Sequence, residues 1–471
     1  PRATLCVRVQ PWLLDGRAQA VLTTRDGLML SVGEGGAVLE IGGARCQVAA
    51  PMLERRWYEL RVILDAGRAR LLQIPLRRVW GIADAGEAAM DGGIDAIEAM
   101  LFAAAFADPY DRFLNGRIED PMILRGIHDG AEPLEPSAQV IAWWDFSADI
   151  ATQRLTDRGP HGLDGRLRNL PTRAVRGSRW SGAAMDWHDR PRDYAATHFH
   201  EDDLYDCEWA TDFTFEVPPD MPSGVYGIRL RGDGEQDILP VYVLPPRGTT
   251  RAPVAFLAST FTYQVYGNHA RGNANASYRA RRAEWNAYPH NPDEHPEYGR
   301  STYNKHVDGS GFCYSSTRRP LLTMRPGFLT FLDRRGSGLR HFAADTHLTD
   351  WLEARHIAFD VITDHDLDRE KLDLLRGYKT VLTGSHPEYH TPNTLNALQD
   401  YVGGGGRLVY LGGNGFYWRI ANSAAVPEVL ELRRAEGAPT RVRGRMAASE
   451  QPGLGVTPIM PALGAPVLSF G

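Results

Sequence analysis

The chain lacks the features that would direct it to a membrane or to a nucleic acid. None of its apolar runs approaches the roughly 20 residues that span a bilayer, and no segment resembles a signal peptide. Positive charge is not in excess either, because the formal net charge is −6 at pH 7, whereas nucleic-acid binding needs a basic stripe. We therefore expect no membrane partner and no nucleic-acid partner.

Cysteine is scarce as well. The chain has four cysteines, at Cys6, Cys46, Cys207 and Cys313. They lie far apart and form no C-x-x-C pair, which argues against a disulfide scaffold and against a zinc knuckle. A reducing, cytoplasmic location is the simplest expectation.

What is present is an ordinary globular composition, with 43% hydrophobic and 23% charged residues over 471 positions. Such a chain should divide into two to four domains. We predict a β-sandwich over residues 1–200, a small β unit and linker over 201–250, and an α/β catalytic domain over 251–471. Because the sequence opens on Pro1 and stops at Gly471 without a helix stop, we expect chain to be missing at both ends and the last domain to be incomplete.

Short strands separated by Gly- and Asp-rich turns fill the first region. They are predicted at Ala3–Val9, Ala20–Thr24, Leu28–Val32, Val38–Ile41, Trp57–Leu64 and Arg68–Gln73. Strands at this spacing indicate a two-sheet sandwich. One helix is expected between Gly92 and Phe106, where apolar residues stand near helical spacing.

Two later runs resemble strands of laminin-G/concanavalin-like jelly rolls. Residues 113–124 (F-L-N-G-R-I-E-D-P-M-I-L) match a closing pattern, and residues 142–146 (A-W-W-D-F) match an opening one, so the jelly roll would be permuted. Such sandwiches bind sugars or proteins, which gives an alternative function: a lectin-like carbohydrate- or protein-binding module on a catalytically inactive α/β domain. Fold alone does not decide between this module and a structural scaffold, although we favour the scaffold.

The second region is predicted to be a small β unit. Phe213–Val217, Gly224–Leu230 and Leu239–Leu244 alternate in the manner of strands. Pro245-Pro246 then indicates a linker into the last region.

Strand and helix alternate in the last region. Strands are predicted at Pro253–Ala258, Phe359–Thr363, Lys379–Thr383 and Arg407–Leu411, and helices at Thr346–His356, Glu370–Gly377 and Thr391–Val402. This order predicts a parallel sheet with covering helices, and the Gly413-Asn414-Gly415 turn after the last strand resembles the elbow of glutamine-amidotransferase-like domains. Ligands bind beyond the carboxyl ends of such strands.

Polar segments follow three of these strands. Residues 262–316 hold seven of the eighteen tyrosines and four histidines without periodicity, S-H-P-E-Y-H occupies 385–390, and L-G-G-N-G-F-Y-W occupies 411–418. A long polar loop usually presents groups to a ligand. The alternative is a surface loop whose tyrosines only cover apolar area.

The Gly413-Asn414-Gly415 turn, expected between a strand and a helix, resembles a nucleophile elbow. Its apex is an asparagine, which excludes covalent Ser or Cys catalysis there but leaves an amide to hold a substrate oxygen. Hydrolysis would then need an activated water, for which a metal is the obvious activator. H-E-x-x-H is absent, and phenol and carboxylate oxygens suit a ferric ion.

Three long motifs together resemble the large subunit of N,N-dimethylformamidases. They are S-T-Y-N-K-H-V-D-G-S-G-F-C-Y-S-S-T-R-R-P from Ser301, S-H-P-E-Y-H from Ser385 and L-G-G-N-G-F-Y-W from Leu411. The resemblance implies a metal-dependent amidase that hydrolyses N,N-dimethylformamide, or a related small N-alkylated formamide, to dimethylamine and formate. It also implies a mononuclear non-haem Fe(III) site built from two tyrosines and one glutamate, and a small helical partner subunit in αβ units, assembled as α2β2 or higher.

The resemblance also implies particular site residues. The metal ligands would be Tyr266, Tyr303 and Glu388, with Tyr314 and Tyr263 as alternatives to Tyr303. Glu388, His386 and Asn414 would be catalytic, with His386 handling protons and Asn414 orienting the substrate. The substrate site would comprise Asn414, Phe312, Phe416 and His306. Structural alternatives remain for two of these: His386 as a strand-end cap and His306 as a hydrogen-bond partner of Asp308.

Overall fold

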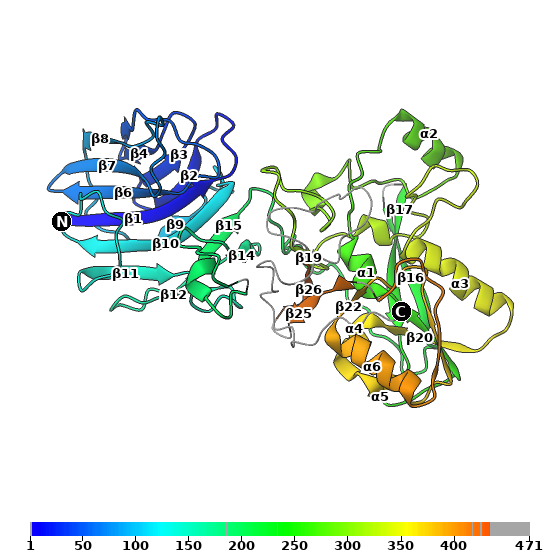
Figure 1. Ribbon diagram of the computed structural model, residues 1–471. Helices are drawn as coiled ribbons and strands as arrows, with labels where there is room; N and C mark the ends of the chain where they lie inside the picture. The colour runs from blue at the N-terminus through cyan, green and yellow to red at the C-terminus, as the bar shows by residue number, and fades with distance from the viewer. Residues whose placement is uncertain (1, 185, 233, 417, 424–425, 434–471) are drawn as a thin grey trace. The chain divides into compact units, whose positions relative to one another are not determined.

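The computed structural model describes residues 2–184, 186–232, 234–416, 418–423 and 426–433, and Figure 1 shows the chain. The described residues form two compact units. Unit 1 comprises 2–203 and 305–310, and unit 2 comprises 204–304 and 311–433. The predicted boundaries at 200 and 250 stay a prediction. Residues 434–471 of the predicted catalytic domain, and Tyr417 of the third motif, lie outside the described residues.

Unit 1 is a sandwich of two β-sheets. The larger sheet has the order β13-β12-β11-β10-β1-β6-β7-β8, with β15 beside β10 and β14 beside β15, and the second has the order β5-β4-β3-β2-β9. Apolar side chains from both sheets, among them Leu5, Val7, Leu30 and Leu39, pack into one core. The strands are β1 (Arg2–Pro11), β2 (Gln19–Thr24), β3 (Leu28–Val32), β4 (Val38–Ile41), β5 (Ala44–Gln47), β6 (Tyr58–Asp65), β7 (Arg68–Pro75), β8 (Gly86–Asp91), β9 (Met100–Phe102), β10 (Gly116–Arg125), β11 (Val140–Asp145), β12 (Arg154–Asp157), β13 (Gly165–Arg166), β14 (Thr172–Val175) and β15 (Ala196–Phe199).

The predicted sandwich and its six predicted strands are therefore confirmed. The more specific laminin-G/concanavalin-like assignment stays a prediction.

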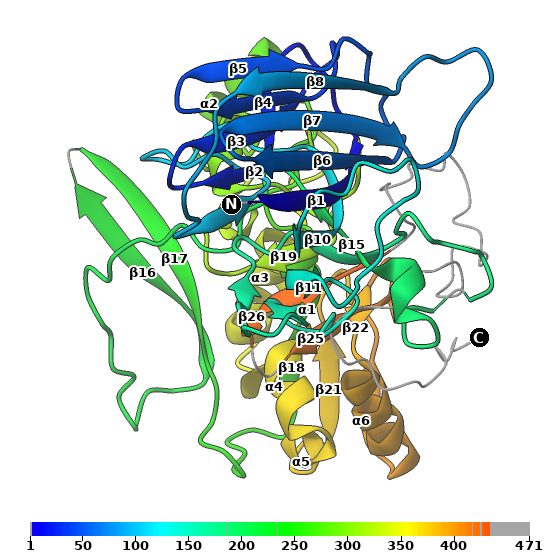
Figure 2. The same cartoon turned by 90° about the vertical axis from the view of Figure 1, so that its left-hand side faces the viewer.

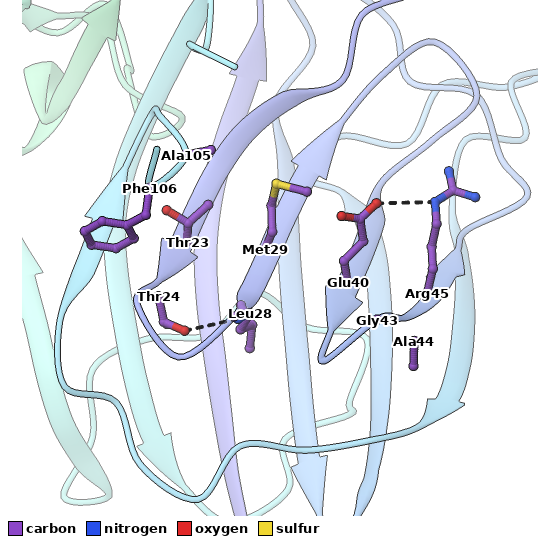
Figure 3. A pocket seen from close by; sticks show the side chains of 11 residues that line it. Thr23, Thr24, Leu28, Met29, Glu40, Gly43, Ala44, Arg45, Ala105 and Phe106 are labelled. Carbon is purple, nitrogen blue, oxygen red and sulfur yellow. Dashed lines mark hydrogen bonds and ion pairs between the residues drawn. The ribbon is translucent and has the colours of Figure 1, made fainter. Parts of the chain in front are cut away.

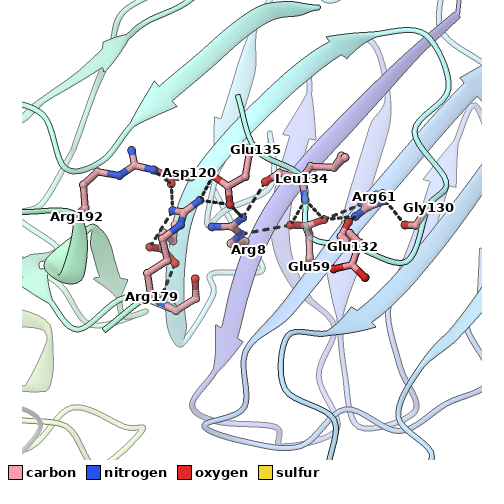
Figure 4. Close-up of polar contacts among 12 residues, drawn as sticks. Arg8, Glu59, Arg61, Asp120, Gly130, Glu132, Leu134, Glu135, Arg179 and Arg192 are labelled. Atoms are coloured by element: carbon pink, nitrogen blue, oxygen red, sulfur yellow. Dashed lines mark hydrogen bonds and ion pairs between the residues drawn. The ribbon is translucent and has the colours of Figure 1, made fainter. Parts of the chain in front are cut away.

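Strands β1, β6 and β10 are buried along nearly their whole length, because both faces of the sheet are covered there. One face meets the apolar core, and the other carries buried ion pairs (Figure 4). Arg8 Nε lies 3.3 Å from Glu59 Oε2, and Arg61 Nη2 lies 2.6 Å from Glu59 Oε1. The loop between β10 and β11 covers these ion pairs. Arg61 Nη1 donates to the Gly130 carbonyl oxygen at 2.6 Å, and the Leu134 N–H donates to Glu59 at 3.1 Å.

The helix predicted for Gly92–Phe106 is wrong. The segment instead contains β9, which pairs antiparallel with β2, with Leu22 opposite Phe102. Gly92 has a φ of +143°, a conformation that favours glycine and does not occur within a helix. The apolar residues near helical spacing fill the edge of the sandwich, where Ile94 packs into the core. Pairing with β2 thus supplies the backbone hydrogen bonds that a helix would have made internally.

Unit 2 opens with the antiparallel hairpin of β16 (Gly224–Gly232) and β17 (Glu235–Val243), seen as a long ribbon in Figure 2. Both strands were expected from the sequence. The strand predicted at Phe213–Val217 is wrong: this described stretch has no regular secondary structure, and Phe213 is 50% exposed. Alternating residues do not hold a strand without a neighbour for the backbone N–H and C=O groups.

Four parallel strands in the order β20-β18-β21-β23 form the centre of unit 2. They are β18 (Val254–Ala258), β20 (Phe359–Thr363), β21 (Thr380–Thr383) and β23 (Arg407–Val409). Connecting helices are α3 (Phe342–Ala354), α4 (Asp364–Glu370), α5 (Leu372–Leu375) and α6 (Pro392–Gly403), of which α4, α5 and α6 lie side by side (Figure 1). The predicted parallel sheet is confirmed, and the helix expected at Glu370–Gly377 is present only as the single turn of α5, because α4 ends at Glu370. The amidotransferase-like assignment stays a prediction.

Shorter elements complete unit 2. They are α1 (Thr260–Val265), α2 (Ala276–Glu284), β19 (Tyr314–Ser316), β22 (Tyr389–His390), β24 (Trp418–Arg419), β25 (Ala421–Ser423) and β26 (Val426–Glu431). Strand β19 pairs with β26 and β26 with β25. Among the described residues of both units, no helix is long and apolar enough to cross a membrane.

The loops that leave β21 and β23 run side by side. Strand β22 pairs in parallel with β24, and the Gly413 and Phe416 N–H groups donate to the Ser385 and Pro387 carbonyl oxygens at 3.0 and 2.8 Å. The helix expected after the Gly413-Asn414-Gly415 turn is wrong, because the next described element is β24. The Trp418 and Ile420 N–H groups donate to the Glu388 and His390 carbonyl oxygens, both at 3.0 Å, so the backbone after the turn pairs with the neighbouring loop and continues as a strand.

Candidate functional site

Two phenols and a carboxylate meet beyond the carboxyl end of β18. Tyr266 Oη lies 2.6 Å from Tyr303 Oη and 2.8 Å from Glu388 Oε2, while Tyr303 Oη lies 3.5 Å from Glu388 Oε1. The Glu388 side chain is completely buried. The structure therefore brings together the three residues that the sequence predicts as metal ligands.

Helix α1 positions two of these residues. Tyr266 directly follows the helix, and its N–H donates to the Thr262 carbonyl oxygen at 3.0 Å. The Thr262 hydroxyl oxygen in turn accepts a hydrogen bond from the Glu388 N–H at 3.1 Å. One threonine thus fixes the distance between the tyrosine and the glutamate.

Tyr303 reaches the same point from the long polar loop. The Ser301 and Thr302 hydroxyls donate to the Val265 carbonyl oxygen, at 2.8 and 3.1 Å. These contacts hold the turn before Tyr303 against the end of α1. The polar loop is therefore tied to the same helix that positions Tyr266.

Nitrogen groups complete the surroundings of Glu388. His386 Nε2 lies 3.1 Å from Glu388 Oε2, and Asn414 Nδ2 donates to Glu388 Oε1 at 3.3 Å. Both residues stand on the paired loops after β21 and β23. His386, predicted to handle protons, and Asn414, predicted to orient the substrate, thus contact different oxygens of the Glu388 carboxylate.

Three further residues lie at the site that were not predicted from the sequence. The Tyr389 hydroxyl hydrogen-bonds that of Tyr303. The Arg340 guanidinium lies 4.7 Å from the centroid of the Tyr266 ring, and its Nη2 lies 3.3 Å from His386 Nε2. The His341 ring lies 4.3 Å from the Tyr266 ring. Tyr389 sits inside S-H-P-E-Y-H and could have been noticed, whereas Arg340 and His341 stand in an unremarkable loop.

Burial controls protonation at this site. Burial, followed by the neighbouring Tyr303 and Glu388, raises the pKa of Tyr266 well above that of a free phenol. Burial and the Arg340 charge lower the pKa of His341 well below its ordinary value. The phenol is therefore neutral at pH 7 unless a cation replaces its proton, and His341 is uncharged.

This donor set fits a ferric ion. Phenolate and carboxylate oxygens are hard anionic ligands, which suit hard cations better than soft ones, and tyrosine is a known iron ligand. The two phenol oxygens lie 2.6 Å apart, and each lies within 3.5 Å of one of the two Glu388 carboxylate oxygens. Tyr266, Tyr303 and Glu388 are therefore the residues that would hold the metal.

The alternative tyrosines have other partners. The Tyr263 hydroxyl donates to Asp345, and Arg433 Nη2 donates to the Tyr314 hydroxyl oxygen at 3.5 Å. Neither of these contacts is with Glu388.

The residues predicted to bind substrate lie in different parts of the structure. Phe416 stacks on His390, with ring centroids 4.9 Å apart, and Phe312 is half-buried. His306 belongs to unit 1, where its Nδ1 lies 2.6 Å from Asp202 Oδ1.

Unit 1 has an open pocket of about 410 Å³, shown in Figure 3. Thr23, Met29, Glu40 and Arg45 lie along it, and Phe106 is its aromatic side chain. This pocket is where the lectin-like alternative would place a ligand.

Comparisons with known proteins agree with the sequence motifs. Residues 172–453 match the family described as N,N-dimethylformamidase beta subunit-like, C-terminal. The N,N-dimethylformamidase beta subunit of an Alcaligenes species is 35% identical over 88% of this chain and 59% of its own length. That of Paracoccus aminophilus is 33% identical over 87% of this chain and 59% of its own length. The chain thus spans about 59% of the length of these relatives.

One solved structure aligns with a smaller part of the chain. A Bacteroides ovatus protein, provisionally described as carbohydrate-binding, has 13% identity and a TM-score of 0.28 over 33% of this chain and 49% of that chain. At this TM-score the alignment supports no conclusion about fold or function.

Proposed function

The chain belongs to the N,N-dimethylformamidase beta subunit-like family, and on that premise we propose that it hydrolyses N,N-dimethylformamide, or a related small N-alkylated formamide, to dimethylamine and formate. The observation that carries the proposal is the meeting of Tyr266, Tyr303 and Glu388, with Oη to Oη and Oη to Oε2 distances of 2.6 and 2.8 Å. Tyr303 and Glu388 lie in the first and second motifs, and Asn414 of the third motif donates to the same Glu388 carboxylate.

We propose a mononuclear non-haem Fe(III) ion on these three residues. A bound ferric ion would polarise the formyl carbonyl and acidify a water molecule. Three anionic ligands would balance its charge, at the cost of two phenol protons released on binding.

Proton transfer is assigned to His386. Its Nε2 takes the proton from the attacking water as the water oxygen adds to the formyl carbon, and Glu388 Oε2, 3.1 Å away, stabilises the imidazolium. His386 then returns the proton to the amide nitrogen as the C–N bond breaks and dimethylamine leaves.

Asn414 is assigned to the substrate oxygen. Its amide nitrogen lies 3.3 Å from Glu388 Oε1, so a small rotation would direct an N–H towards a carbonyl bound beside the carboxylate. We propose Phe312 and Phe416 as apolar walls for the N-methyl groups. A substrate-binding role for His306, which belongs to unit 1, stays a prediction.

A partner subunit is also proposed. The two relatives are named beta subunits, which implies another subunit in those enzymes, and we propose a small helical one here, in an α2β2 or larger assembly. A reducing, cytoplasmic location is proposed because Cys6, Cys46, Cys207 and Cys313 are all free thiols.

The second candidate function is carbohydrate or protein binding by unit 1, and the pocket in Figure 3 is the observation that favours it. It ranks lower because a pocket of that volume is common in a scaffold domain, whereas the convergence of two tyrosines on a buried carboxylate is not. Lectin-like binding would persist after the metal is removed, but amide hydrolysis would not.

The deciding experiment is elemental analysis with a visible spectrum on the full-length chain co-expressed with its small subunit. We expect about one iron per chain, a tyrosinate-to-Fe(III) charge-transfer band, and dimethylamine release that chelation abolishes and iron restores. Zinc or no metal at this site, with dimethylamine release unaffected by chelation, would refute the proposal.

A further inference from the structure

A second cluster of donor side chains lies entirely within unit 1. His198 is on β15 and His200 directly follows that strand, while His306 and Asp308 come from the segment 305–310. All four side chains are buried. The i, i+2 spacing of the first two histidines puts them on one face of an extended chain. Donors from two distant parts of the sequence therefore meet at one buried point.

The Asp308 carboxylate is held in a fixed orientation. Its Oδ1 accepts hydrogen bonds from the Ser310 N–H at 2.8 Å and from the Ser310 hydroxyl at 2.5 Å. Its Oδ2 is left facing His198 Nε2 at 2.8 Å and His200 Nε2 at 3.7 Å. One carboxylate oxygen thus stands between two imidazole nitrogens.

These distances suit a small cation. The ligand atoms of His198, His200 and Asp308 all lie within 4.8 Å of one another. Ligands 2.0–2.1 Å from a tetrahedral zinc ion stand roughly 3.3 Å apart, which falls within the observed range. Neutral imidazole nitrogen and carboxylate oxygen are the usual ligands of such ions.

Hydrogen bonding alone leaves the cluster one proton short. His200 Nδ1 lies 3.1 Å from Asp203 Oδ1, and His200 Nε2 lies 2.9 Å from the Ser310 hydroxyl oxygen. If neutral His200 donates to Asp203, the single Ser310 proton has to serve both His200 and Asp308. If His200 donates to Ser310 instead, its bare Nδ1 faces a carboxylate oxygen. Either one extra proton or one cation is therefore required.

A cation resolves this conflict with every group in its ordinary state. His200 then donates from Nδ1 to Asp203 and directs Nε2 at the ion, and Ser310 donates to Asp308 Oδ1. A carboxylate behind a metal-bound histidine is the arrangement that fixes its tautomer and orientation. His306 would pack behind, since its ring stacks on that of His200 at a centroid distance of 3.6 Å and an interplanar angle of 4°.

Coordination through His198 Nε2, which faces Asp308 Oδ2 at 2.8 Å, places the ring proton of His198 on Nδ1. The metal-free alternative places the extra proton on the Asp203 carboxyl, whose Oδ1 lies 3.1 Å from His200 Nδ1.

We propose that His198, His200 and Asp308 bind a divalent transition metal of the zinc type, at a site independent of the Tyr/Glu site of unit 2. The ion would tie the segment 305–310 to β15. Residues on both sides of that segment belong to unit 2, and Tyr303 lies two positions before it in the chain. Three protein ligands leave one position of a tetrahedral ion for water, and the role assigned to the ion is to anchor the loop that continues from a proposed iron ligand.

The test is metal analysis of the full-length protein, purified without chelators and equilibrated with zinc. We expect about one zinc per chain in addition to iron. His198→Gln and Asp308→Asn should lower zinc at least about tenfold while iron is retained. Glu388→Ala should do the reverse, so a failure of the iron proposal is distinguishable from a failure of this one.

Two controls separate ligand loss from general damage. His365→Gln removes a half-buried histidine that hydrogen-bonds Thr260 and Gln264, and it should leave zinc unchanged. Anomalous diffraction at the zinc edge on the unmodified protein should show a peak between Asp308 Oδ2 and the two Nε2 atoms, whether or not the variants fold. Zinc absent from that position, or zinc content equal in the unmodified protein and Asp308→Asn, would overturn the proposal in favour of a protonated Asp203.

Discussion

Tyr266 and Tyr303 stack ring on ring, with centroids 4.1 Å apart, planes inclined by 14° and hydroxyl oxygens 2.6 Å apart. Stacking aligns the two C–O bonds, so both phenols point at the Glu388 carboxylate. The Arg340 guanidinium faces the Tyr266 ring as well, where a cation is favoured over the π face. The pair is thus a rigid two-phenol donor, which makes the loss of a single hydroxyl a sharp test of the proposed site.

Glu388→Ala is expected to abolish both bound iron and turnover. The variant removes the only carboxylate in the proposed donor set, and burial, the largest cause of the raised pKa of Tyr266, still opposes the loss of that phenol's proton. Asn414→Ala is the matched comparison: it should retain iron and lower kcat about 10²–10³-fold, as the loss of one oxyanion donor does. Iron analysis and dimethylamine release measure both. Full iron content in Glu388→Ala would show that the ligand assignment is wrong.

Tyr303→Phe and Tyr314→Phe should separate the alternative ligands. Tyr303→Phe keeps the stacked ring but loses the hydroxyl, so we expect the charge-transfer band to shift or disappear and iron affinity to fall at least about tenfold. Tyr314→Phe should leave both unchanged, because the partner of that hydroxyl is Arg433. Titration with iron, followed in the visible spectrum, gives both quantities. The opposite ranking would move the second ligand to Tyr314.

Much of the framework could be predicted because its signals are local. β18, β20 and β21 are short apolar runs bounded by turn residues, and the parallel sheet follows from the helices between them. The errors have tertiary causes. Gly92–Phe106 has near-helical spacing, but β2 offers a pairing edge, and Phe213–Val217 alternates as a strand but has no neighbour to pair with.

Prediction of the site from the sequence is limited in the same way, because tertiary packing creates its contacts. Tyr266 and Glu388 could be proposed from motifs, but their 2.8 Å contact depends on Thr262, whose hydroxyl oxygen accepts from the Glu388 N–H. Arg340 and His341 carry no motif, and only the packing of their loop brings them to Tyr266. The pairing of His198 with Asp308 joins positions 110 residues apart, which no spacing rule connects.

Unit 2 should lose stability as the pH falls below about 6.5, and His390 is a main cause. Burial lowers the pKa of His390 to about 4, so between pH 6.5 and 4 the unfolded chain binds a proton that the folded chain does not. The contribution of neutral His390 to the free energy of unfolding is complete above pH 6.5. It is lost as the pH falls towards 4, by roughly 3 kcal/mol at most. Urea unfolding at several pH values should show a flatter profile for His390→Gln than for the exposed control His347→Gln. If the free energy of unfolding depends on pH equally in the two variants, His390 is not a main cause of the loss of stability.

Glu59→Gln should destabilise unit 1 strongly. Arg8 and Arg61 lie on either side of Glu59, at 3.3 and 2.6 Å, and all three side chains are at most 2% exposed. Removing the Glu59 charge leaves the buried Arg61 guanidinium without its ion-pair partner, whereas Arg8 keeps Glu135 Oε1 at 3.0 Å. Breaking a buried pair in this way typically costs about 3–5 kcal/mol. Asp373→Asn is the control, because its ion pair with Arg376 is exposed and should contribute no more than about 1 kcal/mol. Urea unfolding of both variants measures the difference, and equal losses would mean that water reaches the Arg8–Glu59–Arg61 cluster and screens its charges.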